Sequence, residues 1–233
     1  MKTEKPRGKE RPHTTMIMAN STLEWIAALV VFAVLFAFMW EYHRWRDRPF
    51  SLFTANKATA IAASLCFCIA LILGPVSRIT RRLTRSGLLT RAVRFRRPLA
   101  CTAAFFMTVH LFLSLLLVEK FDLAYFADHC LSWIFGSLAF GGLLAMWILS
   151  YPAAVRRRGI EVWKRAHHMG YIFLTLIVIH IVCLGKVPNW LRWLETLDKP
   201  VPPGTTVPSA AIVLTLIVRL VDALGKGKET SQT

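Results

Sequence analysis

The stretch PLACTAAFFMTVHLFLSLLLV, residues 98–118, contains 21 residues without a charged side chain and includes one histidine, His110. A run of about 20 apolar residues matches the hydrocarbon core of a bilayer, which is roughly 30 Å thick. An imidazole is expensive in hydrocarbon, so an intramembrane histidine indicates a functional site. The stretch therefore predicts a membrane-spanning helix that carries part of a functional site.

Five other stretches of the chain have the same apolar character. With the stretch at 99–118 they predict an all-α integral membrane protein built as a six-transmembrane-helix bundle, in keeping with 55% hydrophobic residues and a mean hydropathy of +0.48. The last is the weakest, because Pro208 opens it and Arg219 interrupts it. The other five stretches are residues 23–42, 58–76, 131–151, 168–185 and about 207–221.

The basic residues fall mainly on one side of this arrangement. If the N-terminus is cytoplasmic, 21 of the 29 Lys and Arg lie on the cytoplasmic side, including eight arginines between residues 78 and 97. Cytoplasmic loops carry such an excess, so both termini are predicted to be cytoplasmic. We expect a disordered tail over 1–20, a membrane domain over 21–224 and a second cytoplasmic tail over 225–233. The net charge of +16 is thus explained first by membrane topology and not by nucleic-acid binding. Second, the basic residues would form a docking surface for an acidic partner.

Several features restrict the chemistry. The chain has no glycine-rich nucleotide-binding loop and no Walker lysine loop, so nicotinamide or flavin domains would have to come from another polypeptide. Residues 187–199 (VPNWLRWLETLDK) predict an amphipathic interfacial helix with Trp190, Trp193, Leu194 and Leu197 on one face. Cys130 and Cys183 both fall near the outer face, which leaves a disulfide between them open.

His110 and His180 fall at the same expected depth. His110 lies 12 residues after Pro98 and His180 lies 13 residues after His167, which places them about 18 and 20 Å into two helices that run in the same direction. Imidazoles from facing helices are typical axial ligands of a heme. The alternative, that each is a buried histidine bonded to a backbone carbonyl, stays open. His167 lies at the cytoplasmic boundary, where a headgroup-facing role is the more usual one.

Three stretches resemble a known family: LILGPVSR (71–78), RRPLACTAAFFMTVHLFLSLL (96–116) and GIEVWKRAHHMGYIFLTLIVIH (159–180). They resemble the ferric-reductase-like transmembrane domain shared by NADPH oxidases, ferric reductases and MsrQ, the heme-binding membrane subunit of bacterial methionine-sulfoxide repair. The resemblance covers roughly residues 55–185. It implies a six-helix b-type cytochrome, with His110 and His180 as ligands of an outer heme and His167 as a ligand of an inner one.

The chain departs from the NADPH oxidase pattern at one place. Those oxidases carry a second histidine 13 or 14 positions earlier on the third helix, where this chain has Arg97 and Arg96. An arginine can pair with a heme propionate but cannot complete a bis-imidazole site. The chain is in this respect more similar to MsrQ, and the second heme stays open.

The resemblance implies a heme-containing electron-transfer subunit in the bacterial inner (plasma) membrane. Its donor would be a cytoplasmic flavin reductase or a membrane quinol, with FMN or quinone association also open, and its acceptor a periplasmic oxidoreductase. One alternative is a ferric-chelate reductase subunit. Another is a non-heme transporter or assembly protein, although the paired halves and broken helices typical of transporters are not evident. Membrane lipid is an expected partner and nucleic acid is not.

Overall fold

The computed structural model describes residues 22–49, 51–84, 92–118 and 120–230, and these residues form helices without a strand. Six helical spans are long and apolar enough to cross a membrane, which confirms the predicted all-α six-helix bundle. The tail expected over residues 1–20 lies outside the described residues. The spans are built from α2 (Thr22–Trp45), α3 (Leu52–Thr84), η2 with α4 (Ala92–Phe95, Arg96–Phe112), α6 (Cys130–Leu149), α8 with α9 (Ile160–His168, Gly170–Cys183) and α11 (Thr206–Thr230).

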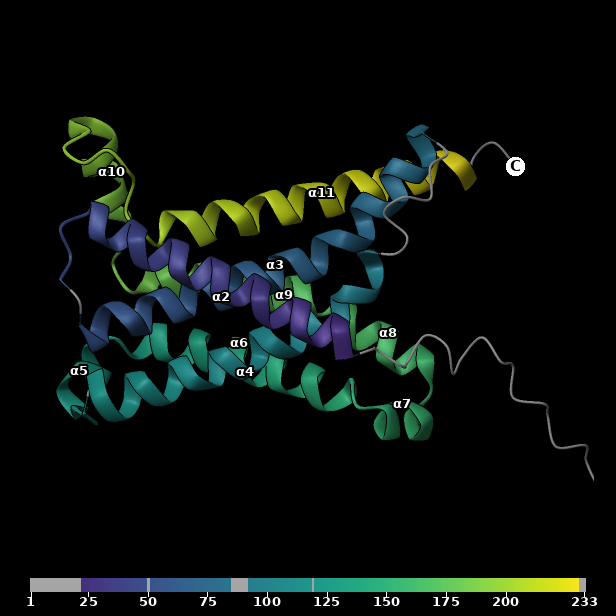
Figure 1. Ribbon diagram of the computed structural model, residues 1–233, viewed down its shortest axis with the longest axis horizontal. Coiled ribbons are helices and arrows are strands. Elements are labelled where there is room, and N and C mark those ends of the chain that lie inside the picture. Colours follow the sequence, from purple (N-terminus) through teal and green to yellow (C-terminus); the bar gives the residue numbers. More distant parts are fainter. Residues whose placement is uncertain (1–21, 50, 85–91, 119, 231–233) are drawn as a thin grey trace, which may run out of the picture.

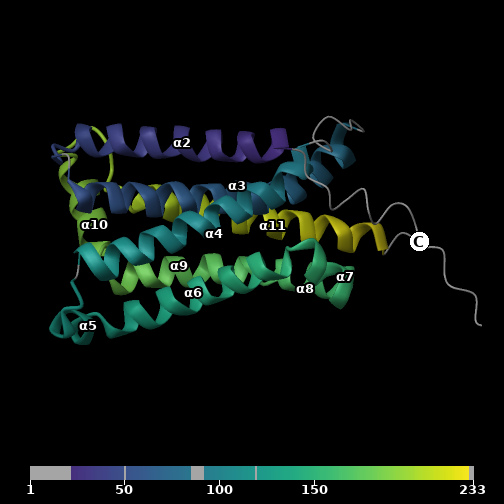
Figure 2. The same cartoon turned by 60° about the horizontal axis from the view of Figure 1, so that its bottom comes forward.

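Helix α3 is the centre of the bundle. Of its most apolar window 67% is buried, against at most 28% for each of the other five spans. It packs against α2, α4 and α11, while α6 packs against α9 (Figures 1 and 2). The small side chains of Ala58, Ala62, Ala63 and Ala70 are buried on it. Small residues let neighbouring helices approach closely, which is how membrane helices gain packing energy.

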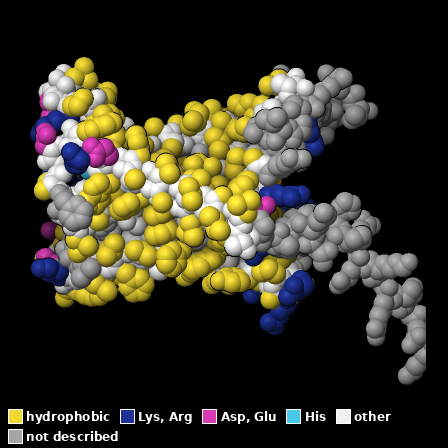
Figure 3. Space-filling model, viewed as in Figure 1, with side chains coloured by type: hydrophobic (Ala, Val, Ile, Leu, Met, Phe, Trp, Pro, Cys, Tyr) yellow, Lys and Arg dark blue, Asp and Glu magenta, His cyan; other side chains and the backbone are white. Residues whose placement is uncertain are grey.

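The two ends of the bundle differ in charge. One end carries α7 (Pro152–Arg158), α8 and the last turns of α3 and α11 (Figure 1). We call it the arginine-rich end, after Arg78, Arg82 and residues 156–158. The other, the α10 end, carries α5 (Leu123–Asp128) and α10 (Val187–Thr196). An apolar band separates them, and the α10 end shows acidic and basic side chains together (Figure 3).

A buried carboxylate ties α11 to α3 at the arginine-rich end. Asp222 has no exposed surface, and Arg78 binds both of its oxygens, with Nη2 2.6 Å from Oδ2. Arg82 and Arg219 also pair with it, at 3.6 and 3.0 Å. A buried carboxylate is tolerated when it is paired and hydrogen-bonded in this way.

Helix α10 forms where the sequence predicts an amphipathic helix, but its tryptophans turn back toward the following segment. Trp190 donates to Thr205 Oγ1 and Trp193 to the Lys199 carbonyl, both at 2.9 Å. Leu194 and Leu197 remain exposed. The helix ends at Thr196, so Leu197 is its C-cap and not part of the helical face, while the indole N–H groups find partners in the loop.

One ion pair joins the two connecting segments at the α10 end. Lys199 pairs with Asp47, which lies between α2 and α3. The hydrogen bond from Lys199, together with its positive charge, lowers the pKa of the Asp47 carboxyl below its ordinary value. The segment after α10 is thereby held against the loop that leads into α3.

Candidate functional site

His110 lies near the C-terminal end of α4 and is held by a side chain of α3. Its Nδ1 donates to Oδ1 of Asn56 at 2.7 Å, and Asn56 is only 4% exposed. The amide Nδ2 of Asn56 donates in turn to Oγ of Ser114 at 2.8 Å. Because Oδ1 can only accept, the His110 proton resides on Nδ1. Its Nε2 is therefore left with a lone pair.

The turn that follows His110 is unusual. Residues Leu113–Val118 form a π-helix directly after α4, and Ser114 is its second residue. π-helical turns are rare and occur frequently at functional sites. This one presents the Ser114 hydroxyl to the Asn56 amide, so the local backbone and the His110 contact belong to one network.

His180 lies on α9 and is held by the backbone of α6. Its Nδ1 is 2.8 Å from the Ser132 carbonyl oxygen and 2.9 Å from the Ser132 hydroxyl, while that hydroxyl also contacts the His180 carbonyl at 3.2 Å. A carbonyl only accepts, so Nδ1 again carries the proton. Gly136 makes room for this ring, because a Cβ there would lie 2.8 Å from Nδ1.

The two histidines form a single arrangement, which we call the paired site. Helices α4 and α9 each pack against both α3 and α6, so the rings come from two sides of one four-helix group. They lie close enough for the charge of one to act on the other. Neither side chain is fully covered by protein, and among the described residues neither Nε2 has a hydrogen-bond partner. A histidine that binds a metal usually has one ring nitrogen hydrogen-bonded, as Nδ1 is here, and the other available to the metal, as Nε2 is here.

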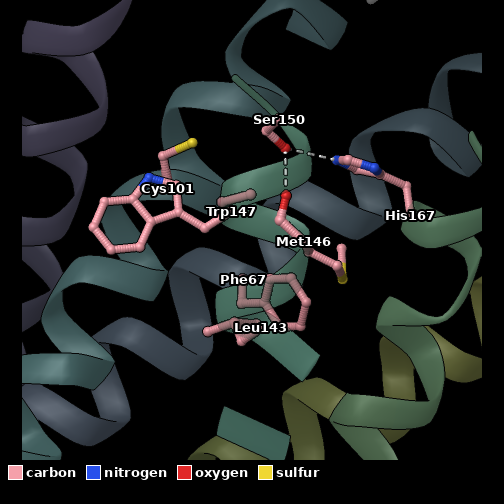
Figure 4. A pocket seen from close by; sticks show the side chains of 8 residues that line it. Phe67, Cys101, Leu143, Met146, Trp147, Ser150 and His167 are labelled. Atoms are coloured by element: carbon pink, nitrogen blue, oxygen red, sulfur yellow. Dashed lines mark hydrogen bonds between the residues drawn. The ribbon is translucent and has the colours of Figure 1, made fainter. Parts of the chain in front are cut away.

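His167 lies on α8, at the arginine-rich end, in what we call the single site. Its Nδ1 donates to the Trp163 carbonyl at 2.8 Å. Its Nε2 is 3.4 Å from the Ser150 hydroxyl, which donates to the Met146 carbonyl at 2.7 Å (Figure 4). Because that hydroxyl proton is already used, the contact to Nε2 is long and its lone pair stays available.

The space beside His167 is small. A cavity of about 10 Å³ adjoins it, which is room for about one water molecule. Its apolar lining includes Phe67, Leu143 and Met146 (Figure 4). The single site as it stands therefore has space for a water molecule and not for a macrocycle.

Arg96 and Arg97 lie near the single site. Arg96 is close enough to His167 for its charge to act on the imidazole, and its Nε donates to the Ala70 carbonyl at 2.9 Å. Its guanidinium lies over Gly74, where a Cβ would be 3.0 Å from Nη1. Arg97 lies close to Cys101, which lines the cavity. Helix α4 thus brings positive charge to His167 and no second imidazole.

Comparison with known families agrees with this arrangement. Residues 59–178, which are 120 of the 233 residues, match the ferric reductase like transmembrane component. The chain belongs to this family. Among curated proteins no significant match was found.

Ferric reductase-like domains are typically heme-binding, and this family indicates a membrane electron-transfer subunit. The matched residues run from α3 to α9 and include His110 and His167. They end two residues before His180, so the position of that residue in the paired site rests on the structure.

The structure adds site residues that the sequence pattern did not identify. Asn56, Ser132 and Gly136 all contact or border the histidines of the paired site. Of these residues only Asn56 could have been found from the sequence. It is an amide a few residues into a helix that runs opposite to α4, which places it at the depth of His110. All five cysteines, including Cys130 and Cys183, are free thiols.

Proposed function

We propose that the chain is a b-type cytochrome subunit in which the Nε2 atoms of His110 and His180 hold one heme. The observation that carries the proposal is the paired site, where both Nδ1 atoms are engaged and both Nε2 atoms are open. In the described part of the chain no three His, Cys, Asp or Glu side chains gather around a bare-metal site. Two imidazoles suffice for a heme, which brings its own equatorial ligands.

A heme supplies a one-electron couple, and the protein supplies position and surroundings. Asn56 and the Ser132 carbonyl fix the two ring orientations and keep the protons away from Nε2. The Gly136 backbone lets the His180 ring approach α6. The hydrogen-bond partners of both rings are neutral, and Lys186 lies close enough to His180 for its charge to act on that ring.

The single site supports a more limited proposal. His167 can offer Nε2 to an iron, and Arg96 and Arg97 can pair with a carboxylate such as a heme propionate. Because the cavity there has room for about one water molecule, a second heme would require the helices to separate. The proposal therefore rests on one heme, and it assigns no second heme, FMN or quinone to this end.

The proposed direction of electron flow follows the charge of the two ends. We place the arginine-rich end and both termini in the cytoplasm, since cytoplasmic segments carry the excess of Lys and Arg. A cytoplasmic flavin reductase or a membrane quinol would deliver electrons there. The paired site, nearer the α10 end, would pass them to a periplasmic oxidoreductase, as in an MsrQ-like system of the bacterial inner membrane.

The test is a dithionite-reduced minus oxidised absorbance spectrum of the purified full chain, with the heme quantified as its pyridine complex. We expect a b-type α-band and about one heme per chain. A protein expressed with ample heme that shows no α-band would refute the proposal. Reporter fusions at Asp122 and Arg158 test the orientation separately, and they should report opposite sides of the membrane.

A further inference from the structure

The two histidines of the paired site are held by different kinds of acceptor. His180 donates to a backbone carbonyl, that of Ser132. His110 donates to a side chain, the amide of Asn56. A backbone carbonyl persists through any substitution at its residue, whereas an amide oxygen depends on Asn56 itself.

We propose that Asn56 is a positioning residue that selects the metal-binding tautomer of His110 and sets its strength as an electron donor; this inference rests on the proposed heme ligation. Oδ1 accepts the Nδ1 proton at 2.7 Å, a short contact for a nitrogen donor. Accepting that proton makes Nε2 more basic. A more basic ligand favours ferric over ferrous iron, so the contact lowers the midpoint potential.

Ser114 determines which way the amide of Asn56 faces. Its hydroxyl oxygen accepts from Nδ2 at 2.8 Å, which turns Oδ1 toward His110. If the amide were reversed, its NH₂ group would face Nδ1 and the imidazole proton would move to Nε2. A protonated Nε2 cannot bind iron. The π-helical turn that carries Ser114 therefore supports the tautomer that the ligand role requires.

Burial makes this dependence strong. Asn56 is 4% exposed, so no bulk water replaces its oxygen when it is removed. An ordinary packing role for Asn56 would also make substitutions destabilising, because Asn56 joins α3 to α4 and to the π-helical turn. Protein yield alone does not separate the two roles, but the midpoint potential of the bound heme does.

The experiment compares four variants of the full chain in detergent or nanodiscs, measuring heme affinity and midpoint potential. Asn56→Leu removes the acceptor, and we expect a more positive potential and roughly 10- to 100-fold weaker heme binding, as for lost outer-shell partners. Asn56→Asp keeps an oxygen acceptor and adds charge, so its potential should become more negative. Ser114→Ala should give a smaller positive shift. Ser64→Ala is the matched control, since this hydroxyl is buried on the same helix as Asn56 but donates to the Ala60 carbonyl of that helix.

Opposite shifts in Asn56→Leu and Asn56→Asp, with Ser64→Ala unchanged, are the expected result. Wild-type potentials in both Asn56 variants would overturn the inference, as would a folded Asn56→Asp protein that binds no heme. If neither Asn56 variant folds, Ser114→Ala decides, and an unchanged potential there overturns it. A wild-type protein without heme, or His110→Ala with full heme, would instead refute the proposed function itself.

Discussion

The paired site offers two imidazoles from facing helices, whereas the single site offers one. In the paired site His110 and His180 donate to neutral oxygen acceptors. In the single site His167 also donates to a neutral carbonyl, but Arg96 places positive charge near it. One region offers two open imidazoles, with the charge of Lys186 acting on one of them, and the other offers a single imidazole on which the charge of Arg96 acts.

The difference shows that a buried histidine is not by itself a heme site. All three imidazoles have Nδ1 engaged and Nε2 available for a ligand. Only the paired site supplies a second imidazole from a facing helix, which a six-coordinate heme requires. The single site suits an anionic group instead, because arginine side chains attract carboxylates and phosphates.

The largest expected effect separates the two sites directly. His110→Ala or His180→Ala removes one of the two proposed heme ligands, and we expect most of the heme to be lost. His167→Ala should leave the heme of the paired site in place. The pyridine complex, measured per chain on folded protein, gives the result. Stoichiometric heme in all three variants would mean that the ligand assignment is wrong.

Gly136 gives the second largest effect and tests the paired site without touching a ligand. In Gly136→Ala the new Cβ would lie 2.8 Å from His180 Nδ1, so the ring must shift. We expect a 10- to 100-fold loss of heme affinity, as for other outer-shell changes. Gly141→Ala is the matched control on the same helix, since nothing lies within 4 Å of its Cβ. Equal affinities in the two variants would show that His180 does not bind the heme in this orientation.

Asp222 tests whether the arginine-rich end is independent of the paired site. Asp222→Asn removes a carboxylate that is fully buried and paired with Arg78, Arg82 and Arg219. We expect a loss of about 3 kcal/mol in stability, seen as a lower Tm, because breaking a buried ion pair leaves charge uncompensated. The absorbance spectrum of the bound heme should not change. A changed spectrum would show that the packing of α3 and α11 controls the paired site.

Much of this fold could be predicted from the sequence because membrane spans are set by length and apolarity. The rise of 1.5 Å per residue also allows the depths of His110 and His180 to be compared from their positions in the chain alone. The acceptors could not be predicted in the same way. The partner of His180 is a backbone carbonyl, which every residue has, and the partner of His110 depends on how α3 is rotated against α4.

The ion pairs at the helix ends could likewise be predicted only in part from the sequence. Arg219 is visible in the sequence as an interruption of the last apolar run, three residues before Asp222. That Asp222 also binds Arg78 depends on α3 and α11 being neighbours, which no local pattern encodes. Likewise the tryptophans of α10 follow the predicted periodicity but turn toward partners in a later loop.

The smallest expected effect is a shift in midpoint potential, which measures how strongly the charge of Arg96 at the single site acts on a heme at the paired site. Arg96 lies 14 residues before His110 on one helix, or about 21 Å along its axis. At an effective dielectric constant of about 20, a unit charge at that distance contributes about 0.8 kcal/mol, roughly 30 mV for one electron. Arg96→Gln removes positive charge and destabilises the reduced heme, so the midpoint potential should fall by about that amount with heme content unchanged. Arg157→Gln, an exposed position on α7, should show almost none because solvent and salt screen it. A fall several times larger would place Arg96 against the heme itself, and the two sites would then be parts of one.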